Sequence, residues 1–325
     1  MKRILLIRFS SIGDIVLTTP IIRCIKKQYP DVEISFLTKD EYVPILEANP
    51  YINSIYSFKN SLSEVIPLLK AADFDLIIDL HKNLRSFIVK VRLLKKSISF
   101  NKLNIRKWLR VNFKINSLPE THIVDRYFFV LRSLKIKNDG QGLDYFIPEK
   151  DVVDLRTLPS AYKSGFYAIV IGAKHFTKRF PIDKQIELID NLKLPIVLFG
   201  NQKEYNDGEI IKTRTQNEVF NSCGLFNINQ SASLLKLAKT VITNDTGLMH
   251  IASALNKDII SIWGCTIPEF GMYPYQIKMP KNQIKYVQVQ NLNCRPCSKI
   301  GLSKCPKEHF ECMHNIKVEE IIAAL

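Results

Sequence analysis

Two short polar turns, each directly after an apolar run, carry the residues of this sequence that could do chemistry. The first is Ser10-Ser11-Ile12-Gly13-Asp14, which follows Arg3–Phe9. Gly13 lets the backbone turn tightly, and Asp14 opens the next stretch at a position where a helix dipole favours a carboxylate. A functional carboxylate at the edge of a sheet is one interpretation. The other is an N-cap that stabilises the helix by about 1 kcal/mol and has no further role.

The second turn is Asn244-Asp245-Thr246-Gly247-Leu248-Met249-His250, between the apolar runs Val241–Thr243 and Ile251–Ala254. In a strand–turn–helix arrangement, the free N–H groups of residues 246–248 lie at the helix start, which readily binds phosphate. His250 lies one turn into the helix, where it either contacts the ligand or is a hydrogen-bonded structural residue. This turn predicts an anion site.

A basic loop is predicted at the same edge of the sheet as this anion site. It covers Gly172–Pro181, directly after the apolar run Phe166–Ile171, and contains Lys174, Lys178 and Arg179. Several cations beside a helix start suit a diphosphate. An exposed basic loop without a ligand is the alternative.

Four of the seven cysteines are clustered near the C-terminal end of the sequence. Cys294, Cys297, Cys305 and Cys312 have the spacing C-x2-C-x7-C-x6-C. Cytosolic chains seldom keep structural disulfides, and four thiolates can bind a structural zinc ion that has no open position. Reduced thiols that hold a loop in place are the equal alternative.

The elements that position these residues are short apolar runs alternating with amphipathic stretches. Such alternation predicts an α/β protein built of βαβ units with parallel sheets, whose ligands bind beyond the carboxyl ends of the strands. The predicted strands are Arg3–Phe9, Val32–Leu37, Leu76–Leu80, Phe166–Ile171, Ile196–Phe199, Val241–Thr243 and Ile259–Ile262. The predicted helices cover 15–29, 183–192, 203–216 and 231–239. The polar stretch 148–165 is interpreted as a linker, so that residues 1–155 and 156–325 form two α/β domains with a cleft between them.

Length and composition exclude several classes of protein. The 325 residues are 46% hydrophobic and 24% charged, which is typical of a globular protein that buries a sizeable core. No apolar run approaches the length of a membrane span, and the run after Met1-Lys2-Arg3 is too short for a signal peptide. We expect a cytoplasmic protein, either soluble or peripheral at a membrane.

The net charge of +15 is unevenly distributed along the chain. No acidic residue occurs between Asp79 and Glu120, and helically spaced apolar residues interleave with the cations there. The cations are Lys82, Arg85, Lys90, Arg92, Lys95, Lys96, Lys102, Arg106, Lys107, Arg110 and Lys114. A basic amphipathic segment suits a polyanion or an anionic membrane surface, and a solvated helix face is the alternative.

The ordered set of motifs resembles glycosyltransferase family 9, the ADP-heptose:lipopolysaccharide heptosyltransferases. The R-x-S-S-x-G-D…P, I-D-L…N-L-R-S, G-A…K-R-[WF]-P and D-T-G-x-x-H motifs of that family, and its Cys-x-Pro-Cys…Cys-Pro…Cys-Met tail, are matched in order along nearly the whole chain. The matching residues include Arg8, Ser10, Ser11, Gly13, Asp14, Pro20, Asp79, Asn83, Arg85, Gly172, Lys178, Arg179, Asp245, Thr246, Gly247 and His250.

The resemblance implies a GT-B fold, which consists of two Rossmann-like domains with parallel sheets facing across a cleft. It implies an inverting transfer of heptose from a nucleotide sugar, with ADP-heptose expected, to a lipid-linked, phosphorylated lipopolysaccharide core sugar at the inner membrane face. No metal or cofactor is required for that reaction. The N-terminal domain would bind the acceptor and the C-terminal domain the nucleotide sugar.

The resemblance also assigns roles to single residues. Asp14 would be the general base, and Lys178 with the amides at residues 246–248 would hold the diphosphate. An inverting displacement needs such a base on one side and a leaving-group stabiliser on the other. The donor-binding candidates are Lys178, Asp245, Thr246, Gly247, Leu248 and His250. The acceptor-side candidates are Ser10, Ser11, Gly13, Asn83 and Arg85.

Two other classes of function fit part of the sequence. A basic nucleic-acid-binding protein with a zinc module would use residues 82–114 and the cysteines, but known binding-module motifs are absent from the sequence and aromatic residues are sparse in that window. A nonenzymatic nucleotide-sugar binder would differ in lacking turnover. We therefore interpret the basic window as an acceptor and membrane-surface feature, with no nucleic-acid partner expected.

Overall fold

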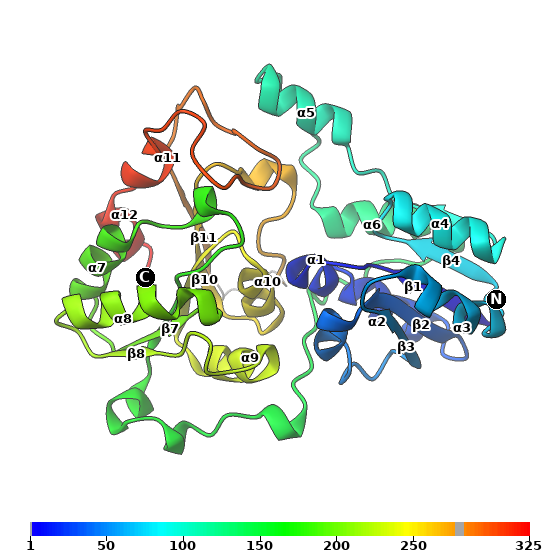
Figure 1. Cartoon of the computed structure of the whole chain (residues 1–325), viewed down its shortest axis with the longest axis horizontal. Coiled ribbons are helices and arrows are strands. Elements are labelled where there is room, and N and C mark those ends of the chain that lie inside the picture. Colours follow the sequence, from blue (N-terminus) through cyan, green and yellow to red (C-terminus); the bar gives the residue numbers. More distant parts are fainter. Residues whose placement is uncertain (1, 277–282) are drawn as a thin grey trace. The chain divides into compact units, whose positions relative to one another are not determined.

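The computed structural model describes residues 2–276 and 283–325, which form two compact units (Figure 1). Unit 1 comprises Met1–Lys102 and Thr121–Pro148, and unit 2 comprises Leu103–Glu120 and Glu149–Leu325. The last of the three crossings between units falls between Pro148 and Glu149, where the predicted linker begins. That stretch is partly built into unit 2, because its Leu158 and Tyr162 are buried in the core there.

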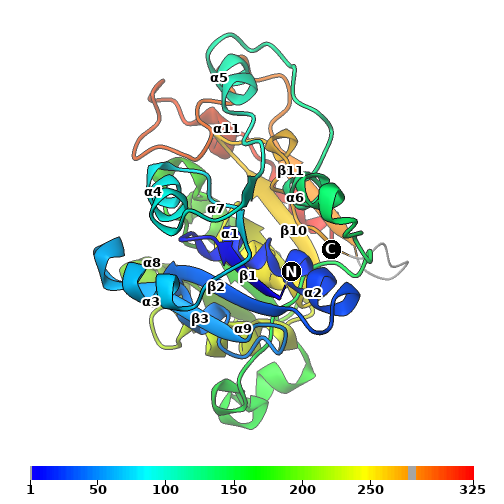
Figure 2. The ribbon, with the colours of Figure 1, turned by 90° about the vertical axis from the view of Figure 1, so that its right-hand side faces the viewer.

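Unit 1 contains a five-stranded parallel sheet in the order β3-β2-β1-β4-β5 (Figure 2). The strands are β1 (Arg3–Ile7), β2 (Glu33–Lys39), β3 (Ser54–Phe58), β4 (Leu76–Asp79) and β5 (Ser97–Ser99). The central strand β1 is buried at four of its five residues, as expected for a parallel sheet covered on both faces. The predicted strands of this half are confirmed, whereas β3 and β5 lack the continuous apolar run that would have revealed them.

The helices of unit 1 are α1 (Ile12–Val16), α2 (Thr19–Gln28), α3 (Ile66–Ala71), α4 (Leu84–Leu93) and α6 (Ile123–Leu131). The prediction of a single helix over 15–29 is therefore wrong in one respect, because the segment forms two helices, α1 and α2. Pro20 has no N–H to donate and is tolerated only in a first turn, so the chain starts α2 anew there. The hydroxyls of Thr18 and Thr19 bond back to the carbonyls of Ile15 and Val16 at 2.7 Å.

Unit 2 contains a six-stranded parallel sheet in the order β11-β10-β9-β6-β7-β8. The strands are β6 (Tyr167–Val170), β7 (Ile196–Phe199), β8 (Val219–Asn221), β9 (Thr240–Asn244), β10 (Asp258–Trp263) and β11 (Ile284–Gln288). The helices are α5 (Asn104–Asn112), α7 (Ile182–Asp190), α8 (Tyr205–Arg214), α9 (Ile228–Leu237), α10 (Gly247–Ala254), α11 (Glu311–His314) and α12 (Val318–Ile322). The strands and helices predicted in this half are confirmed within a few residues.

Alternation along the strands of unit 2 builds a core on each face of its sheet. Along β6, Ile169 belongs to a cluster with residues of α7 and α12. Its neighbours Ala168 and Val170 belong to a second cluster with residues of α9 and α10. Successive strand residues point to opposite faces, so a continuous apolar run fills both cores.

The helix α5 lies within the N-terminal half of the sequence but belongs to unit 2. The basic window is therefore split, with seven of its eleven cations in unit 1 and four, at Arg106, Lys107, Arg110 and Lys114, in unit 2. The predicted domain 1–155 contains the whole window, whereas the structure places residues 103–120 in unit 2. Among the residues that the structure describes, no helix is both long and apolar enough to cross a membrane.

Candidate functional site

In unit 1, the carboxylate of Asp14 is held at the turn between β1 and α1. Its Oδ1 lies 2.5 Å from Nη2 of Arg8, and its Oδ2 accepts hydrogen bonds from the Ser11 hydroxyl at 2.8 Å and the Ser11 amide at 3.3 Å. The Asp14 side chain retains 19% exposure. Asp14 thus closes a capping box with Ser11 while keeping part of its surface open. Both interpretations of this residue, cap and functional carboxylate, agree with that geometry.

The charge of Arg8 decides the protonation state of Asp14. Burial by itself would raise the pKa of this carboxyl, but the Arg8 guanidinium and the hydrogen bonds from Ser11 outweigh burial and lower the pKa below its ordinary value. Arg8 is fixed in turn, because Nε donates to the Ser10 carbonyl at 2.8 Å and Nη1 to the Leu80 carbonyl at 2.5 Å. At neutral pH the site therefore presents a carboxylate that can accept a proton.

His81 is a site residue that the sequence analysis missed. Its ring lies 4.8 Å from the ring of Phe9, and its buried Nδ1 has no hydrogen-bond partner among the described residues. Burial, with the charges of Arg8 and Lys102, lowers the pKa of His81 to about 4, so the imidazole is neutral at pH 7. The signal for it was its place just beyond β4, which pairs with β1 and so ends at the same edge of the sheet.

The predicted acceptor-side residues of unit 1 have different surroundings. Gly13 is buried inside α1. Asn83 caps α4. Its side-chain Oδ1 accepts from the Ser86 backbone amide at 2.9 Å, and its backbone amide donates to the Ser86 hydroxyl at 2.9 Å. Asp79 is buried and stabilises the turn between β4 and α4, because its Oδ1 accepts hydrogen bonds from the backbone amides of His81 and Lys82 at 3.0 and 2.6 Å.

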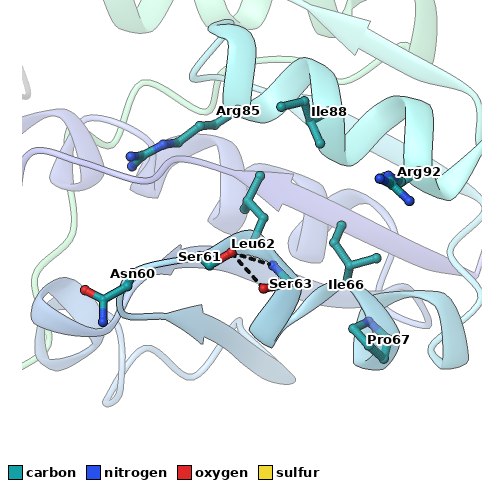
Figure 3. Close-up of a pocket in the computed structure, with 9 residues that line it drawn as sticks. All are labelled: Asn60, Ser61, Leu62, Ser63, Ile66, Pro67, Arg85, Ile88 and Arg92. Carbon is teal, nitrogen blue, oxygen red and sulfur yellow. Dashed lines mark hydrogen bonds between the residues drawn. The ribbon is translucent and has the colours of Figure 1, made fainter.

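Arg85 lines a surface cavity of about 510 Å³ between the α3 region and α4 (Figure 3). A second arginine, Arg92, lies two turns further along α4 with Ile88 between them. The other lining residues are Asn60, Ser61, Leu62, Ser63, Ile66 and Pro67. The cavity combines two guanidinium groups, hydroxyls and an apolar wall, which suits an anionic group attached to an apolar or sugar body.

In unit 2, the structure brings together Lys178 and Asp245, which are distant in the sequence. The Nζ atom of Lys178 lies 2.6 Å from Oδ2 of Asp245, and both side chains are 14% exposed. The loop that carries Lys178 is fastened to the end of β9 because Asn244 accepts from the Phe180 amide at 3.2 Å and donates to the Val170 carbonyl at 3.1 Å. Thr266 orients the Asp245 carboxylate through a 2.9 Å hydrogen bond.

The pair lies beside the start of α10, whose N-terminal amides could hold an anion. Thr246 is the N-cap residue, but its side chain does not cap the helix and instead lies 3.3 Å from the Thr243 hydroxyl. Gly247 and Leu248 then form the first turn with no side chain covering their amides as a cap. An uncapped helix start next to a lysine can bind a phosphate.

The remaining predicted donor-side residues of unit 2 are more enclosed. His250 is 3% exposed, on the buried side of α10. Arg179 is engaged with the protein itself, since its guanidinium donates to the Ala173 carbonyl and to the Glu204 carboxylate, both at 2.9 Å. Of the neighbouring cations Lys178 and Arg179, Lys178 is thus the better placed to meet a ligand.

All seven cysteines are free, and the predicted metal ligands do not form a compact ligand set. Cys312 is buried, whereas Cys294, Cys297 and Cys305 are partly exposed. In the described ranges, no group of three or more His, Cys, Asp or Glu side chains could hold a metal ion. The sulfur of Cys265 donates to the Thr177 hydroxyl at 3.0 Å, in the loop just before Lys178.

Comparison with known proteins adds to this geometry. The model of glycosyltransferase family 9 (heptosyltransferase) matches residues 64–306. The chain is 26% identical to lipopolysaccharide heptosyltransferase 3 of Escherichia coli K12 over 276 residues, which cover 78% of this chain and 80% of that relative. It is 25% identical to lipopolysaccharide heptosyltransferase 1 of Campylobacter coli over 291 residues, covering 81% and 84%.

Solved structures give the same answer for the fold. A family 9 glycosyltransferase from Veillonella parvula has a TM-score of 0.78 at 22% identity, over 99% of this chain and 96% of that one. The E. coli ADP-heptose heptosyltransferase II has a TM-score of 0.70 at 20% identity, over 99% and 100%. The predicted GT-B fold of two Rossmann-like domains with parallel sheets is confirmed. Since the family model spans well over half of the chain, the protein belongs to glycosyltransferase family 9, the heptosyltransferase family, and is a transferase enzyme.

Proposed function

We propose that this protein is an inverting, metal-independent glycosyltransferase that moves a heptose from ADP-heptose to a lipid-linked lipopolysaccharide core acceptor. The relatives named above support the lipopolysaccharide core as acceptor class. An E. coli heptosyltransferase similar in fold was solved with ADP and with an ADP-2-deoxy-2-fluoro heptose, which supports the donor class. The observation that carries the chemistry is the ionised, partly open carboxylate of Asp14.

The proposed step is a single displacement at the anomeric carbon of the donor sugar. The acceptor hydroxyl oxygen bonds to that carbon while the bond to the diphosphate oxygen breaks, and the configuration inverts. Asp14 takes the proton of the hydroxyl as general base. The bonding pair leaves with the diphosphate, and Lys178 with the amides of Gly247 and Leu248 offsets its growing negative charge.

Asp245 holds Lys178 in place before a donor arrives. A diphosphate offers Lys178 more negative charge than a single carboxylate, so the ammonium can be shared with the ligand. Thr246 and His250 would then support the turn from the start and the buried side of α10. In this proposal Asp245 is a positioning residue or a contact of the donor sugar.

On the acceptor side, the proposal uses Ser10, Ser11, Gly13 and Asn83 to shape the turns around Asp14, with Arg85 meeting an anionic group. Arg85 and Arg92 line the cavity of unit 1 and make no ion pair among the described residues. A phosphorylated core sugar suits two unpaired guanidinium groups. The basic window in unit 1 further supports attachment of the enzyme at the cytoplasmic face of an anionic inner membrane.

The deciding experiment combines a donor screen with a transfer assay. Thermal shift across nucleotide sugars should show the largest stabilisation with ADP-heptose, because a ligand that binds the native state raises apparent stability. Mass spectrometry of a lipid-linked lipopolysaccharide core acceptor incubated with that donor should then show the addition of one heptose without added divalent metal. Stabilisation by ADP-heptose without any product would leave a nonenzymatic binder, and loss of transfer in EDTA would refute metal independence.

The structural zinc predicted at Cys294, Cys297, Cys305 and Cys312 is a separate proposal that the transfer step does not use. The related fold of TibC from E. coli is described as iron-containing, so the metal analysis should measure both zinc and iron. About one equivalent of metal per chain in wild type, and its loss in each of the single variants Cys294→Ser and Cys305→Ser, would support four-thiolate binding. If protein purified without chelators contains less than about a tenth of an equivalent of metal, the thiols do not bind metal and only hold the loop in place.

A further inference from the structure

The helix α5 in unit 2 exposes large apolar side chains that an ordinary amphipathic helix would bury. None of its residues is fully buried, yet it carries large apolar side chains on its outer surface. Ile105 is 77% exposed and Trp108 50%, and Phe113 and Ile115 just beyond the helix are 60% and 51% exposed. Helices at a protein surface normally turn such residues toward the core.

The contacts of α5 and of the residues just after it with the rest of unit 2 include two lysines. The ammonium of Lys107 lies 5.6 Å from the centre of the Phe270 ring. The ammonium of Lys114 donates to the carbonyls of Cys294 and Pro296 at 3.1 and 2.8 Å and to that of Val111 at 2.9 Å. These contacts attach α5 and the residues after it to the rest of unit 2 through cations, while the side chains of Ile105 and Trp108 stay exposed.

The outer apolar side is ordered as one stripe. Ile105 and Trp108 are three residues apart and so lie on one helix face. The Trp108 ring meets the Phe113 ring edge to face with centroids 5.3 Å apart, which extends the stripe past the helix end. The exposed Arg106 is next to Ile105 in the sequence, and the surrounding sequence from residue 80 to residue 119 contains no acidic residue.

We propose that α5 and Phe113–Ile115 dock into the headgroup region of an anionic lipid bilayer, with the helix lying in the plane of the surface. This inference rests on the proposed function, whose acceptor is embedded in such a membrane, and it identifies the docking element. Tryptophan, phenylalanine and isoleucine beside arginine and lysine match the interface, where apolar groups enter the acyl boundary and cations meet lipid phosphates. A nine-residue helix is too short to span the bilayer, so it lies on it.

The chain carries its own probe for this contact. It contains two tryptophans, and the other, Trp263, is 1% exposed in the core of unit 2. On addition of vesicles of phosphatidylglycerol and phosphatidylethanolamine, the emission of Trp108 should shift to shorter wavelength and be quenched by brominated lipid. Phosphatidylcholine vesicles, or high salt, should give a smaller response because the anionic attraction is absent or screened. The Trp108→Phe variant should lose the fluorescence response while still sedimenting with vesicles.

Paired variants test the energetics of docking. The double variant Ile105→Ser/Trp108→Ser should bind the anionic vesicles about tenfold more weakly or worse, which corresponds to about 1.4 kcal/mol. The matched control is Val152→Ser/Leu225→Ser, which removes two apolar side chains that are also at least half exposed, elsewhere in unit 2, and should bind as wild type does. An unshifted Trp108 emission, unchanged vesicle binding of the first double variant, or an equal response to RNA would overturn the proposal.

The proposed function is tested apart from the docking. With a deacylated, water-soluble acceptor, the Ile105→Ser/Trp108→Ser variant should transfer sugar as fast as wild type, whereas transfer to acceptor in vesicles should drop in proportion to the lost binding. If wild type transfers no sugar to either acceptor, the proposed function fails and the vesicle result still stands. If both acceptors are affected equally, α5 is not a docking element.

Discussion

The two polar turns, at Asp14 in unit 1 and at Asp245 in unit 2, share one design but differ in how the carboxylate is paired. Each follows a buried strand, opens a helix and binds a cation. In unit 1 the cation is Arg8, six residues away and locked by two backbone carbonyls at 2.8 and 2.5 Å. In unit 2 it is Lys178, from a separate loop, whose side-chain ammonium bonds to Asp245 alone among the described residues.

The difference indicates which ion pair can open for a ligand. A planar guanidinium bound on several sides keeps its place, so Arg8 sets the properties of Asp14 throughout the reaction. A lysine ammonium is a point charge on a flexible stem, so Lys178 can turn from Asp245 to an incoming phosphate. In the proposed reaction, the same local architecture would provide a fixed base in one unit and a movable anion contact in the other.

The largest effect is expected from removing the base. Asp14→Asn should lower kcat by about 10²–10⁴-fold, the usual contribution of a general base, and leave the Kd for donor within about twofold. Calorimetric donor titration and initial rates of heptose transfer measure the two quantities. The matched control is Asp31→Asn on the exposed surface of unit 1, which should change neither. Retained activity in Asp14→Asn would reduce this carboxylate to a helix cap.

The next largest effect should come from the movable cation of unit 2. Lys178→Ala should lower kcat by about 10²–10³-fold, comparable to removing one preorganised contact to a developing negative charge. Asp245→Asn should be milder, because it frees Lys178 from its carboxylate while keeping the ammonium. Rates with saturating donor decide the order of the two variants. A larger loss for Asp245→Asn would mean that Asp245 itself contacts the sugar.

Much of the fold could be predicted because the signals were local. The strand Ile196–Phe199 was predicted to the residue, since four buried apolar residues between polar stretches fit only a covered parallel strand. The break at Pro20 was missed although proline marked it, because the apolar periodicity continues across it. Strands such as β5 and β8, with three residues each, carry too few side chains to show any period.

The site was only partly predictable, because its long-range pairings have no sequence signal. The turns at Asp14 and Asp245 were visible as polar breaks, but nothing local connects Lys178 with Asp245 or His81 with Arg8. The placement of α5 was missed for the same reason. Its membership of unit 2 rests on contacts such as that between Lys114 and the carbonyls near Cys294, 180 residues away in the sequence.

A smaller effect, and the sharpest test of the fixed pairing, is expected from Arg8→Lys. Arg8 lowers the pKa of Asp14 in the folded enzyme, so activity that needs the carboxylate persists to low pH. A lysine keeps the charge but not the fixed geometry, so the acid limb of kcat/KM should move to higher pH with an activity loss of about tenfold, equal to about 1.4 kcal/mol. The stabilisation from this depressed pKa is present above pH about 4 and is lost as pH falls through the folded value.

The control for that profile is Arg3→Lys, because Arg3 pairs with Glu33 at 3.1 Å while both side chains are more than half exposed. Its acid limb should coincide with that of wild type. If Arg8→Lys leaves the limb in place as well, then Arg8 does not set the pKa of the group that titrates in turnover. In unit 2, Lys178→Arg should not shift the acid limb of kcat/KM, since the proposed role of Lys178 is to bind the donor phosphates.

The smallest effect separates capping from acceptor binding at Asn83. Asn83→Ala removes the cap of α4 and should cost about 1 kcal/mol in the free energy of unfolding, as measured by urea denaturation. Asn227→Ala removes the equivalent cap of α9 in unit 2, where Oδ1 accepts from the Gln230 amide at 2.8 Å, and should cost at least as much because its Nδ2 also donates to the buried Asp151 carboxylate at 2.8 Å. If Asn83 only caps, both variants keep the wild-type KM for acceptor. A rise in acceptor KM that is confined to Asn83→Ala would show that this turn of unit 1 also contacts the acceptor, and would extend the difference between the two units from their ion pairs to their helix caps.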